Sequence, residues 1–252
     1  RPPGLAVVLV GDDEASQVYV RNKSRACVEV GFYSDQIHKS ANITEEELLS
    51  EVNRLNENKT IDGILVQLPL PPHIDSNKII EAIIPEKDVD GFSSENIGKL
   101  SQNKSFISPC TPKGVMKMLD SIKCDLRGKD CVIIGASNIV GRPMEMEFLN
   151  AGATVQVCHK ETKDIVQKAS SADVIVAAAG VANLVKEDWV KEGAVIIDVG
   201  INRLDNGTLT GDVDYDAVKD KVSAISPVPG GVGPMTIAVL LENTLTAYQA
   251  KL

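Results

Sequence analysis

Short apolar runs alternate with longer segments of mixed polarity along the whole chain. Residues 5–10 and 61–68 are short and rich in β-branched residues, which is typical of strands buried on both faces. Residues 16–30 and 112–122 have the patterns of helices, and residues 233–250 form a long apolar helix after a glycine-proline turn. Strands separated by helical segments predict an α/β fold in which parallel sheets have helices on both faces.

Local signals add further elements to this pattern. Pro112 can begin a helix, and Thr44 and Glu47 form a possible capping box at the start of another. The stretch 85–112 is expected to be looser. Further strands are predicted at 32–38, 130–135, 153–159, 173–178 and 194–199, and further helices at 75–83 and 140–151.

A boundary between two α/β domains is expected on or near the helix 112–122. The first domain would hold residues 1–115 plus the C-terminal helix, residues 233–252, which would cross back to it. The second, residues 116–232, has the order of strands and helices of a Rossmann-type domain. We expect a cleft between the two domains in which a small molecule binds.

Composition and charge exclude several classes of protein. The chain has 252 residues, of which 43% are hydrophobic, and a mean hydropathy of -0.01, which describes a globular protein with a sizeable core. A net charge of -9 argues against nucleic acid or an anionic membrane as the main partner. No apolar run approaches the roughly 20 residues of a membrane helix. The chain lacks an initial methionine and a signal-peptide pattern, so we expect the natural sequence to begin further upstream.

The cysteines and histidines show no metal-binding pattern. The five cysteines are odd in number and widely spaced, and none forms a Cys-x-x-Cys pair. We expect them to be reduced and mostly buried, as in the cytoplasm, with a metal site or a thiol nucleophile as the alternative. His38, His73 and His159 form no cluster of ligands, so no metal is expected.

A glycine turn at 135–141 predicts a nucleotide site. The segment Gly135-Ala-Ser-Asn-Ile-Val-Gly141 follows a predicted strand and opens a predicted helix. Backbone N–H groups at a helix start favour a phosphate, while Gly135 permits the tight turn and Gly141 permits close packing. The pattern is neither G-x-G-x-x-G nor a Walker loop, so by itself it also fits a simple tight connection.

The end of the next strand bears on the choice of cofactor. An acid at this place binds the ribose 2′-hydroxyl of NAD, and a cation accepts the 2′-phosphate of NADP. Lys160 favours NADP, and Glu161 keeps NAD as the less favoured alternative, although a solvated loop charge is the plainer explanation of Lys160. Two later strands end in small residues near Ala178 and Gly200, which would let a nicotinamide ring approach the backbone.

Candidate catalytic groups precede the nucleotide-binding half of the chain. Ser16, Tyr19 and Lys23 stand at i, i+3 and i+7, which puts a hydroxyl, a phenol and an amine on one stripe of a helix. Gln67 ends a predicted strand and Asp90 follows, so polar groups could converge on a small molecule. Taken singly, these residues have plainer explanations: a solvated lysine, a half-buried tyrosine, a capping glutamine and a turn aspartate.

Five motifs follow one another over nearly the whole chain. They are Tyr19-Val-Arg-Asn-Lys-Ser, Val66-Gln-Leu-Pro-Leu-Pro, Asp88-Val-Asp-Gly-Phe, Gly135-Ala-Ser-Asn-Ile-Val-Gly-Arg-Pro and Pro229-Gly-Gly-Val-Gly-Pro-Met-Thr. Together they resemble the bifunctional methylenetetrahydrofolate dehydrogenase/methenyltetrahydrofolate cyclohydrolase family, in its bacterial form. The resemblance implies that 5,10-methylenetetrahydrofolate gives a hydride to NADP, and that the methenyl product is then hydrolysed to 10-formyltetrahydrofolate.

The resemblance also implies roles for residues. Hydride departure needs no proton transfer by the enzyme, whereas hydrolysis needs an activated water and a protonated leaving nitrogen. Lys23 would shuttle that proton, which requires an amine that is sometimes neutral; Gln67 would hold the amine or the water. Tyr19 would stack on the folate, and Asp90 would accept from the pterin N–H groups. The expected substrate contacts are Tyr19, Lys23, Val66, Gln67, Leu68, Asp90, Pro229, Gly230, Gly231, Val232 and Gly233, and the expected cofactor contacts are Thr111, Gly135, Ala136, Ser137, Ile139, Lys160, Ala178, Gly200, Ile201 and Thr236.

The chain departs from the family pattern in one residue of the glycine turn. Some relatives have arginine where Ala136 stands, so Lys160 would carry more of the phosphate binding. The resemblance further implies tetrahydrofolate derivatives as partners, a homodimer, and a place in the one-carbon metabolism that serves purine biosynthesis.

Three alternatives stand beside this interpretation. A Tyr-x-x-x-Lys pair also marks short-chain dehydrogenases, but here it precedes the glycine turn instead of following the nucleotide-binding start. A non-catalytic nucleotide-binding module would give no reason for Lys23, Gln67 and Asp90 to converge. An enzyme that retains only one of the two steps is the third, and the presence of all three residues argues against loss of the hydrolase.

Overall fold

The computed structural model describes residues 1–252, apart from the side chain of Ala15. The chain divides into two compact units. Unit 1 holds residues 1–110 and 237–252, and unit 2 holds residues 111–236. The divisions thus fall after residues 110 and 236, where the sequence placed them after 115 and 232. Within the described residues, no helix combines the length and apolar character needed to cross a membrane.

Unit 1 is built on a three-stranded parallel sheet in the order β2-β1-β3. The strands are β1 (Gly4–Val10), β2 (Tyr33–Lys39) and β3 (Gly63–Val66). Every residue of β1 is buried, and its alternate side chains enter two different cores, as the period of a strand requires. The predicted parallel pairing is confirmed.

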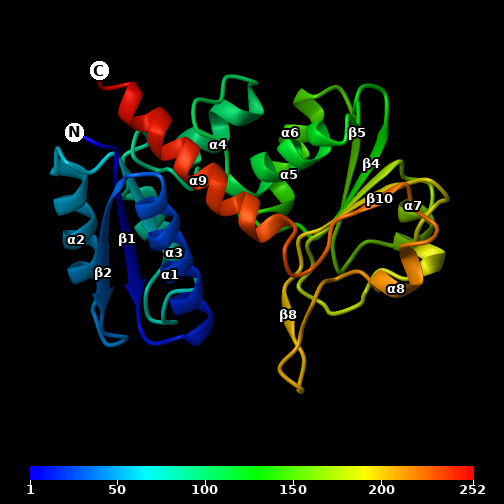
Figure 1. The fold of residues 1–252 in the computed structure, drawn as a ribbon, viewed down its shortest axis with the longest axis horizontal. Coiled ribbons are helices and arrows are strands. Elements are labelled where there is room, and N and C mark those ends of the chain that lie inside the picture. Colours follow the sequence, from blue (N-terminus) through cyan, green and yellow to red (C-terminus); the bar gives the residue numbers. More distant parts are fainter. The chain divides into compact units, whose positions relative to one another are not determined.

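Helices cover both faces of this sheet. The helix α1 (Glu14–Glu29) shares one core with β1 and with α9 (Val232–Gln249). The helices α2 (Glu45–Glu57) and α3 (Ser76–Glu81) share the other core, and α2 lies across the sheet from α1 (Figure 1). The predicted capping box is confirmed, because Thr44 and Glu47 exchange hydrogen bonds at the start of α2.

The stretch 85–112 contains a helix that the sequence analysis did not predict. This helix, α4 (Ser94–Ser101), begins after Ser93, whose side chain accepts a hydrogen bond from the backbone of Asn96. The expectation of a looser stretch was wrong here, because a helix of eight residues offers few positions at which an apolar period can be recognised.

Unit 2 is built on a five-stranded parallel sheet in the order β10-β7-β6-β4-β5. Its strands are β4 (Asp130–Ile134), β5 (Thr154–Cys158), β6 (Val174–Ala177), β7 (Val195–Asp198) and β10 (Ala224–Ile225). The chain passes from β4 to β5 on one side and then returns to place β6 on the other side of β4. The order of strands therefore reverses between β4 and β6, which is where nucleotides bind in such sheets.

Helices also cover both faces of this second sheet (Figure 1). One face packs on α5 (Cys110–Ser121) and α6 (Gly141–Asn150), and the other on α7 (Ile165–Ala169) and α8 (Tyr215–Val218). A short antiparallel pair, β8 (Asn202–Arg203) and β9 (Leu209–Thr210), and a 3-10 turn, η1 (Glu187–Trp189), complete the unit.

Candidate active site and cofactor site

Lys23 lies on the buried face of α1. Its side chain is only 6% exposed, and it shares the buried stripe of the helix with Ser16, Val20 and Cys27. A lysine at such a position is uncommon, because burying an ammonium group costs free energy unless polar groups receive it. The burial of Lys23 therefore sets it apart from an ordinary surface lysine.

Gln67 receives the amine of Lys23. Lys23 Nζ donates a hydrogen bond to Gln67 Oε1 at 3.0 Å, and Gln67 Nε2 donates to the backbone oxygen of Leu68 at 2.8 Å. The backbone N–H of Gln67 donates to the oxygen of Val8 in the neighbouring strand, which continues the pairing beyond β3. Both ends of the amide are thus fixed, with its oxygen toward the amine.

Lys87, a second buried lysine in unit 1, differs from Lys23 in its hydrogen bonds. Lys87 is 4% exposed, and its Nζ donates to three backbone oxygens, those of Leu55, Asn56 and Asn58. All three of its N–H bonds are therefore used. Among the described residues, the only hydrogen bond of Lys23 Nζ is the one to Gln67, so N–H capacity remains for a bound molecule.

Asp90 is half-buried and interacts electrostatically with Lys23. Burial raises the pKa of the Asp90 carboxyl, and the charge of Lys23 opposes that shift. Burial and the charge of Asp90 raise the pKa of the neighbouring thiol, Cys110, well above its usual value. Lys23 thus contacts Gln67 directly, and Asp90 lies within electrostatic range of Lys23, although the three residues are far apart in the sequence.

The loop that carries Asp90 is held by another carboxylate. Asp88 is 1% exposed and accepts hydrogen bonds from the backbone N–H groups of Gly91 and Ser93 and from the side chain of Asn96. Gly91 has a φ of +78°, and a Cβ on it would lie 2.8 Å from backbone atoms of residues 108 and 109. Only glycine fits this position without strain.

Asn243 holds the same loop from α9, and no sequence motif predicted it. The side chain is fully buried, and its Nδ2 donates to the backbone oxygens of Val89 and Ser108, both at 2.9 Å. A buried asparagine inside the most apolar helix of the chain is the one signal that could have indicated it.

The other predicted substrate contacts fall in both units. Tyr19 is half-buried on α1, and burial raises the pKa of its phenol. Val66 ends β3, and Leu68 follows Gln67 and precedes a cis peptide bond to Pro69. The segment 229–233 lies in unit 2 and includes the turn before α9 and the first two residues of that helix.

The glycine turn of unit 2 has the close backbone approach that its two glycines predict. Gly135 has a φ of +123°, and a Cβ on it would lie 2.0 Å from the backbone oxygen of Ala178. A Cβ on Gly141 would lie 2.0 Å from the backbone oxygen of Gly135. The turn opens α6, whose start has no side-chain cap, so backbone N–H groups there can receive an anion.

The remaining predicted cofactor residues lie at the strand ends and helix starts of unit 2. Ser137 and Ile139 are exposed on the glycine turn, beside Ala136. Lys160 is 91% exposed just beyond β5, and its amine is 3.9 Å from the carboxylate of Glu161. Thr111 and Thr236, near the starts of α5 and α9, are joined by a hydrogen bond of 2.9 Å between their hydroxyl oxygens.

Two buried carboxylates beside the predicted contacts Ala178, Gly200 and Ile201 were not singled out from the sequence. Asp198 ends β7 and is 4% exposed; Asp212 follows β9 and is fully buried. Burial raises the pKa of Asp198 to about 6, although hydrogen bonds from three backbone N–H groups act to lower it. An aspartate at the end of an apolar strand, and another after a glycine, were the available signals.

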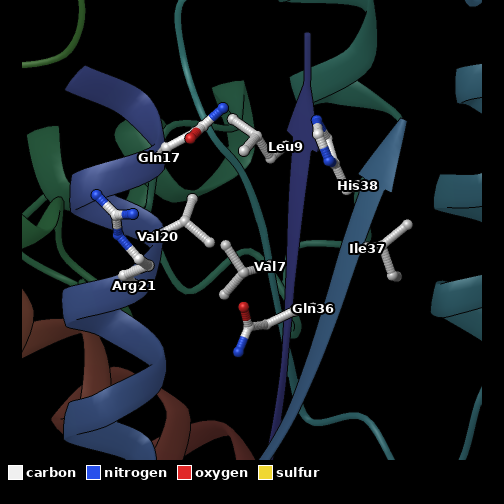
Figure 2. Close-up of a pocket in the computed structure, with 8 residues that line it drawn as sticks. All are labelled: Val7, Leu9, Gln17, Val20, Arg21, Gln36, Ile37 and His38. Atoms are coloured by element: carbon white, nitrogen blue, oxygen red, sulfur yellow. The ribbon is translucent and has the colours of Figure 1, made fainter. Parts of the chain in front are cut away.

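Figure 2 shows a separate cavity of about 260 Å³ in unit 1, between α1 and the strands β1 and β2. Val7, Leu9 and Val20 give it apolar walls, and polar side chains such as Arg21 and His38 also line it. None of the predicted substrate contacts is among its lining residues, so the cavity is distinct from the cluster of Lys23, Gln67 and Asp90.

Known proteins resemble the chain over its whole length. A bifunctional protein FolD from Vesicomyosocius okutanii subsp. Calyptogena okutanii (strain HA) is 63% identical over 252 residues, which are 100% of this chain and 91% of that protein. The crystal structure of the FolD methylenetetrahydrofolate dehydrogenase/cyclohydrolase from Campylobacter jejuni has a TM-score of 0.97 and 56% identity, and the match covers 99% of this chain and 89% of that one.

A third similar protein was solved with a cofactor. The methylenetetrahydrofolate dehydrogenase-cyclohydrolase of Trypanosoma brucei, in complex with NADP and an inhibitor, has a TM-score of 0.96 and 40% identity; the match covers 100% of this chain and 88% of that one. Two family models also match, the catalytic domain over residues 1–90 and the NAD(P)-binding domain over residues 109–252. The chain therefore belongs to the tetrahydrofolate dehydrogenase/cyclohydrolase family.

Proposed function

We propose that this chain oxidises 5,10-methylenetetrahydrofolate to the methenyl compound with NADP, and then hydrolyses that product to 10-formyltetrahydrofolate. Membership of the family supports both steps. The single observation that carries the residue assignment is the buried amine of Lys23, held by Gln67 and close to the charge of Asp90.

Lys23 serves the hydrolytic step as the group that moves a proton. Hydrolysis adds water to the methenyl carbon and breaks its bond to one folate nitrogen, which must leave protonated. Lys23 Nζ has N–H capacity left beyond its bond to Gln67, so it can hydrogen-bond to the attacking water or to that nitrogen. Gln67 keeps the amine in place, because its own amide is fixed at both ends.

Asp90 serves substrate binding. Its carboxylate offers two acceptor oxygens, which suit the adjacent N–H donors of a pterin ring. Asp88 and Asn243 fix the loop from two sides, so these oxygens keep one direction. Tyr19 offers an aromatic face on the same stripe of α1 as Lys23.

The residues of unit 2 fit a dinucleotide. At Gly135 the backbone leaves no room for a Cβ, so only glycine allows this close approach. The start of α6 has no side-chain cap, so its backbone N–H groups can bind a phosphate. Lys160 stands beyond β5, where a 2′-phosphate is recognised in such folds. When bound, NADP supplies the hydride acceptor of the first step. Ala178 and Gly200 follow the neighbouring strands β6 and β7 and have little or no side chain, so a flat ring can approach the backbone there.

We further propose the setting in which the protein acts. Tetrahydrofolate derivatives are its partners, it forms a homodimer, and it works in the cytoplasm in the one-carbon metabolism that serves purine biosynthesis. The resemblance of the motifs to the family implies these statements, and no nucleic acid or membrane partner is expected from the net charge of -9.

An absorbance assay with the purified protein tests the proposal. Methylenetetrahydrofolate is supplied with NADP or with NAD, and formation of the reduced cofactor is followed. A second assay follows loss of methenyltetrahydrofolate without any cofactor. Activity in both assays, with NADP preferred, is the expected result. Cofactor reduction without hydrolysis would indicate an enzyme that retains only one step. Absence of both activities would indicate a non-catalytic nucleotide-binding module.

A further inference from the structure

We propose that Asp212 is a positioning residue of the cofactor site, which holds the backbone turn 179–181 in the shape that receives the nicotinamide half of NADP. The inference rests on the proposed function and adds to it a residue that touches neither substrate nor cofactor. It arises from the hydrogen bonds of this fully buried carboxylate.

Asp212 accepts four hydrogen bonds. Its Oδ2 receives the backbone N–H groups of Ala179 at 2.6 Å and Gly180 at 2.9 Å. Its Oδ1 receives the backbone N–H of Val181 at 3.0 Å and the side-chain amide of Asn202 at 2.8 Å. Three successive N–H groups that converge on one carboxylate fix the direction of the whole turn.

The turn lies where the order of strands reverses. Residues 179–181 follow β6, and Ala178, the residue before them, makes the closest approach to Gly135 in the glycine turn after β4. The crevice between these two strand ends is the place where dinucleotides bind in sheets of this kind. Since β5, which Lys160 follows, lies on the other side of β4 from β6, the β6 side is left for the nicotinamide half.

The backbone hydrogen bonds of Asp212 hold a turn at the surface and do not hold part of the hydrophobic core. Residues 179, 180 and 181 are exposed, so fixing them buries no apolar side chain. Burying a carboxylate costs free energy unless hydrogen bonds compensate for the lost hydration. Because the hydrogen bonds of Asp212 go to an exposed turn, we infer that the shape of this turn has a function. A binding site for a rigid ring is such a use.

A second buried carboxylate, that of Asp198, holds the backbone of Asp212 in place. Its Oδ1 accepts from the backbone N–H of Asp212 at 2.9 Å and of Gly200 at 3.0 Å, and its Oδ2 accepts from that of Val213 at 2.9 Å. A Cβ on Gly200 would lie 2.1 Å from Asp212 Oδ1, and one on Gly211 would lie 1.8 Å from Asp198 Oδ2. The two carboxylates and the two glycines therefore form one interlocked unit behind the strand ends.

The test substitutes Asp212→Asn in the full chain. An amide has one acceptor oxygen, so its NH₂ group faces backbone N–H donors and the turn loses part of its support. We expect the Kd for NADP to rise at least about tenfold, in line with the loss of charge-assisted hydrogen bonds. Binding of adenosine 2′,5′-bisphosphate, which lacks the nicotinamide half, is expected to stay within about twofold, and so is cofactor-free hydrolysis of methenyltetrahydrofolate.

Asp214→Asn is the matched control. Asp214 is two residues away, but its carboxylate pairs with Lys186 at the surface and contacts no part of the turn 179–181. We expect the control to bind NADP as the parent does. If Asp212→Asn fails to fold, Asn202→Ala removes only one of the four donors, and a rise of about threefold in the Kd for NADP is then expected.

Three results overturn the inference. The first is an unchanged Kd for NADP in a folded Asp212→Asn or Asn202→Ala protein. The second is an equal loss of NADP binding and of adenosine 2′,5′-bisphosphate binding. The third is a loss of hydrolysis together with NADP binding, because that result would indicate a general structural role. Failure of the parent itself to bind or reduce NADP would instead remove the proposed function, so the two failures are distinguishable.

Discussion

The amine of Lys23 lies 3.0 Å from the side-chain oxygen of Gln67, although 44 positions separate the two residues in the sequence. The contact joins the buried face of α1 to the end of β3. It fixes the amine at one point and leaves N–H capacity for another partner, whereas all N–H bonds of Lys87 are used by backbone oxygens. This difference between two buried lysines supports the proposal that Lys23 is reactive and that Lys87 is structural.

Replacement of Lys23 by methionine tests this distinction. Lys23→Met keeps the length and apolar stem of the side chain but removes the amine that we propose moves a proton. We expect methenyltetrahydrofolate hydrolysis to fall at least about 100-fold, in the range of general acid–base catalysis, while NADP-dependent oxidation is at least partly retained. Separate absorbance assays of the two steps measure this, and hydrolysis at the parental rate would refute the assignment.

Lys87→Met is the comparison for this variant. It leaves three backbone oxygens near the end of α2 without their donor, so it should lower the free energy of unfolding. In the protein that remains folded, the ratio of hydrolysis to oxidation is expected to match the parent. A selective loss of hydrolysis in this variant as well would mean that the Lys23 result reflects general damage to unit 1.

Replacement of Asn243 by leucine tests how the Asp90 loop is held. Asn243→Leu keeps the branched shape of the side chain on α9 but removes the donor to Val89 and Ser108. Two buried backbone oxygens lose a partner, so we expect the free energy of unfolding to fall by about 2 to 4 kcal/mol. The KM for methylenetetrahydrofolate should rise, because Asp90 directly follows Val89, while the Kd for NADP should not change.

Thr246→Val provides the control on the same helix. The Thr246 hydroxyl bonds only to the backbone oxygen one turn earlier within the described residues, so its loss should change stability by less than about 0.5 kcal/mol. Urea unfolding and steady-state kinetics measure both variants. If Asn243→Leu lowered stability but left the KM for the folate at the parental value, Asn243 would support the fold without positioning Asp90.

The sequence predicted the strands and long helices of both units because their patterns are local. The apolar run of β1 and the capping box of α2 are read from a few neighbouring residues. The two-residue strand β10 and the short helix α4 carry too few residues for a period to show, and tertiary pairing decides them instead.

The candidate site was predictable only in part, for a similar reason. Motifs predict Lys23, Gln67 and Asp90, but they predict neither Asn243, which holds the loop of Asp90, nor Asp212, which holds the turn 179–181. Asn243 and Asp212 act through hydrogen bonds to backbone groups far away in the sequence, and any residue type can supply a backbone group. No motif records such a contact, so a buried polar residue in apolar surroundings is the only sign of it.

Replacement of Lys160 by alanine tests the preference for NADP. Its side chain is 91% exposed, so solvent weakens its attraction for a 2′-phosphate. We expect the KM for NADP to rise about fivefold and the KM for NAD to change by less than about twofold. Lys163→Ala, an exposed lysine on the same loop, should change neither value. Equal loss with both cofactors would show that Lys160 does not recognise the 2′-phosphate.

The buried carboxyl of Asp198 predicts a particular dependence of stability on pH. Burial raises its pKa to about 6, whereas in the unfolded chain it titrates near about 4. Between these values the folded protein keeps a proton that the unfolded chain has lost, so this contribution is greatest below about pH 4 and is lost as the pH rises through about 6. A rise of the pKa from about 4 to about 6 corresponds to about 3 kcal/mol at most.

Comparison with Asp198→Asn isolates this contribution, because the amide does not titrate. Trp189, the single tryptophan of the chain, lies in unit 2 with Asp198, so its fluorescence follows the unfolding of that unit in urea. The free energy of unfolding of the parent minus that of the variant should fall by about 2 kcal/mol between about pH 4.5 and pH 7. Carboxylates with lowered pKa values, such as Asp173 beside Lys191, contribute in the opposite direction but cancel in the difference. A difference that rises with pH would mean that the three backbone N–H groups outweigh burial and that Asp198 is charged throughout this range.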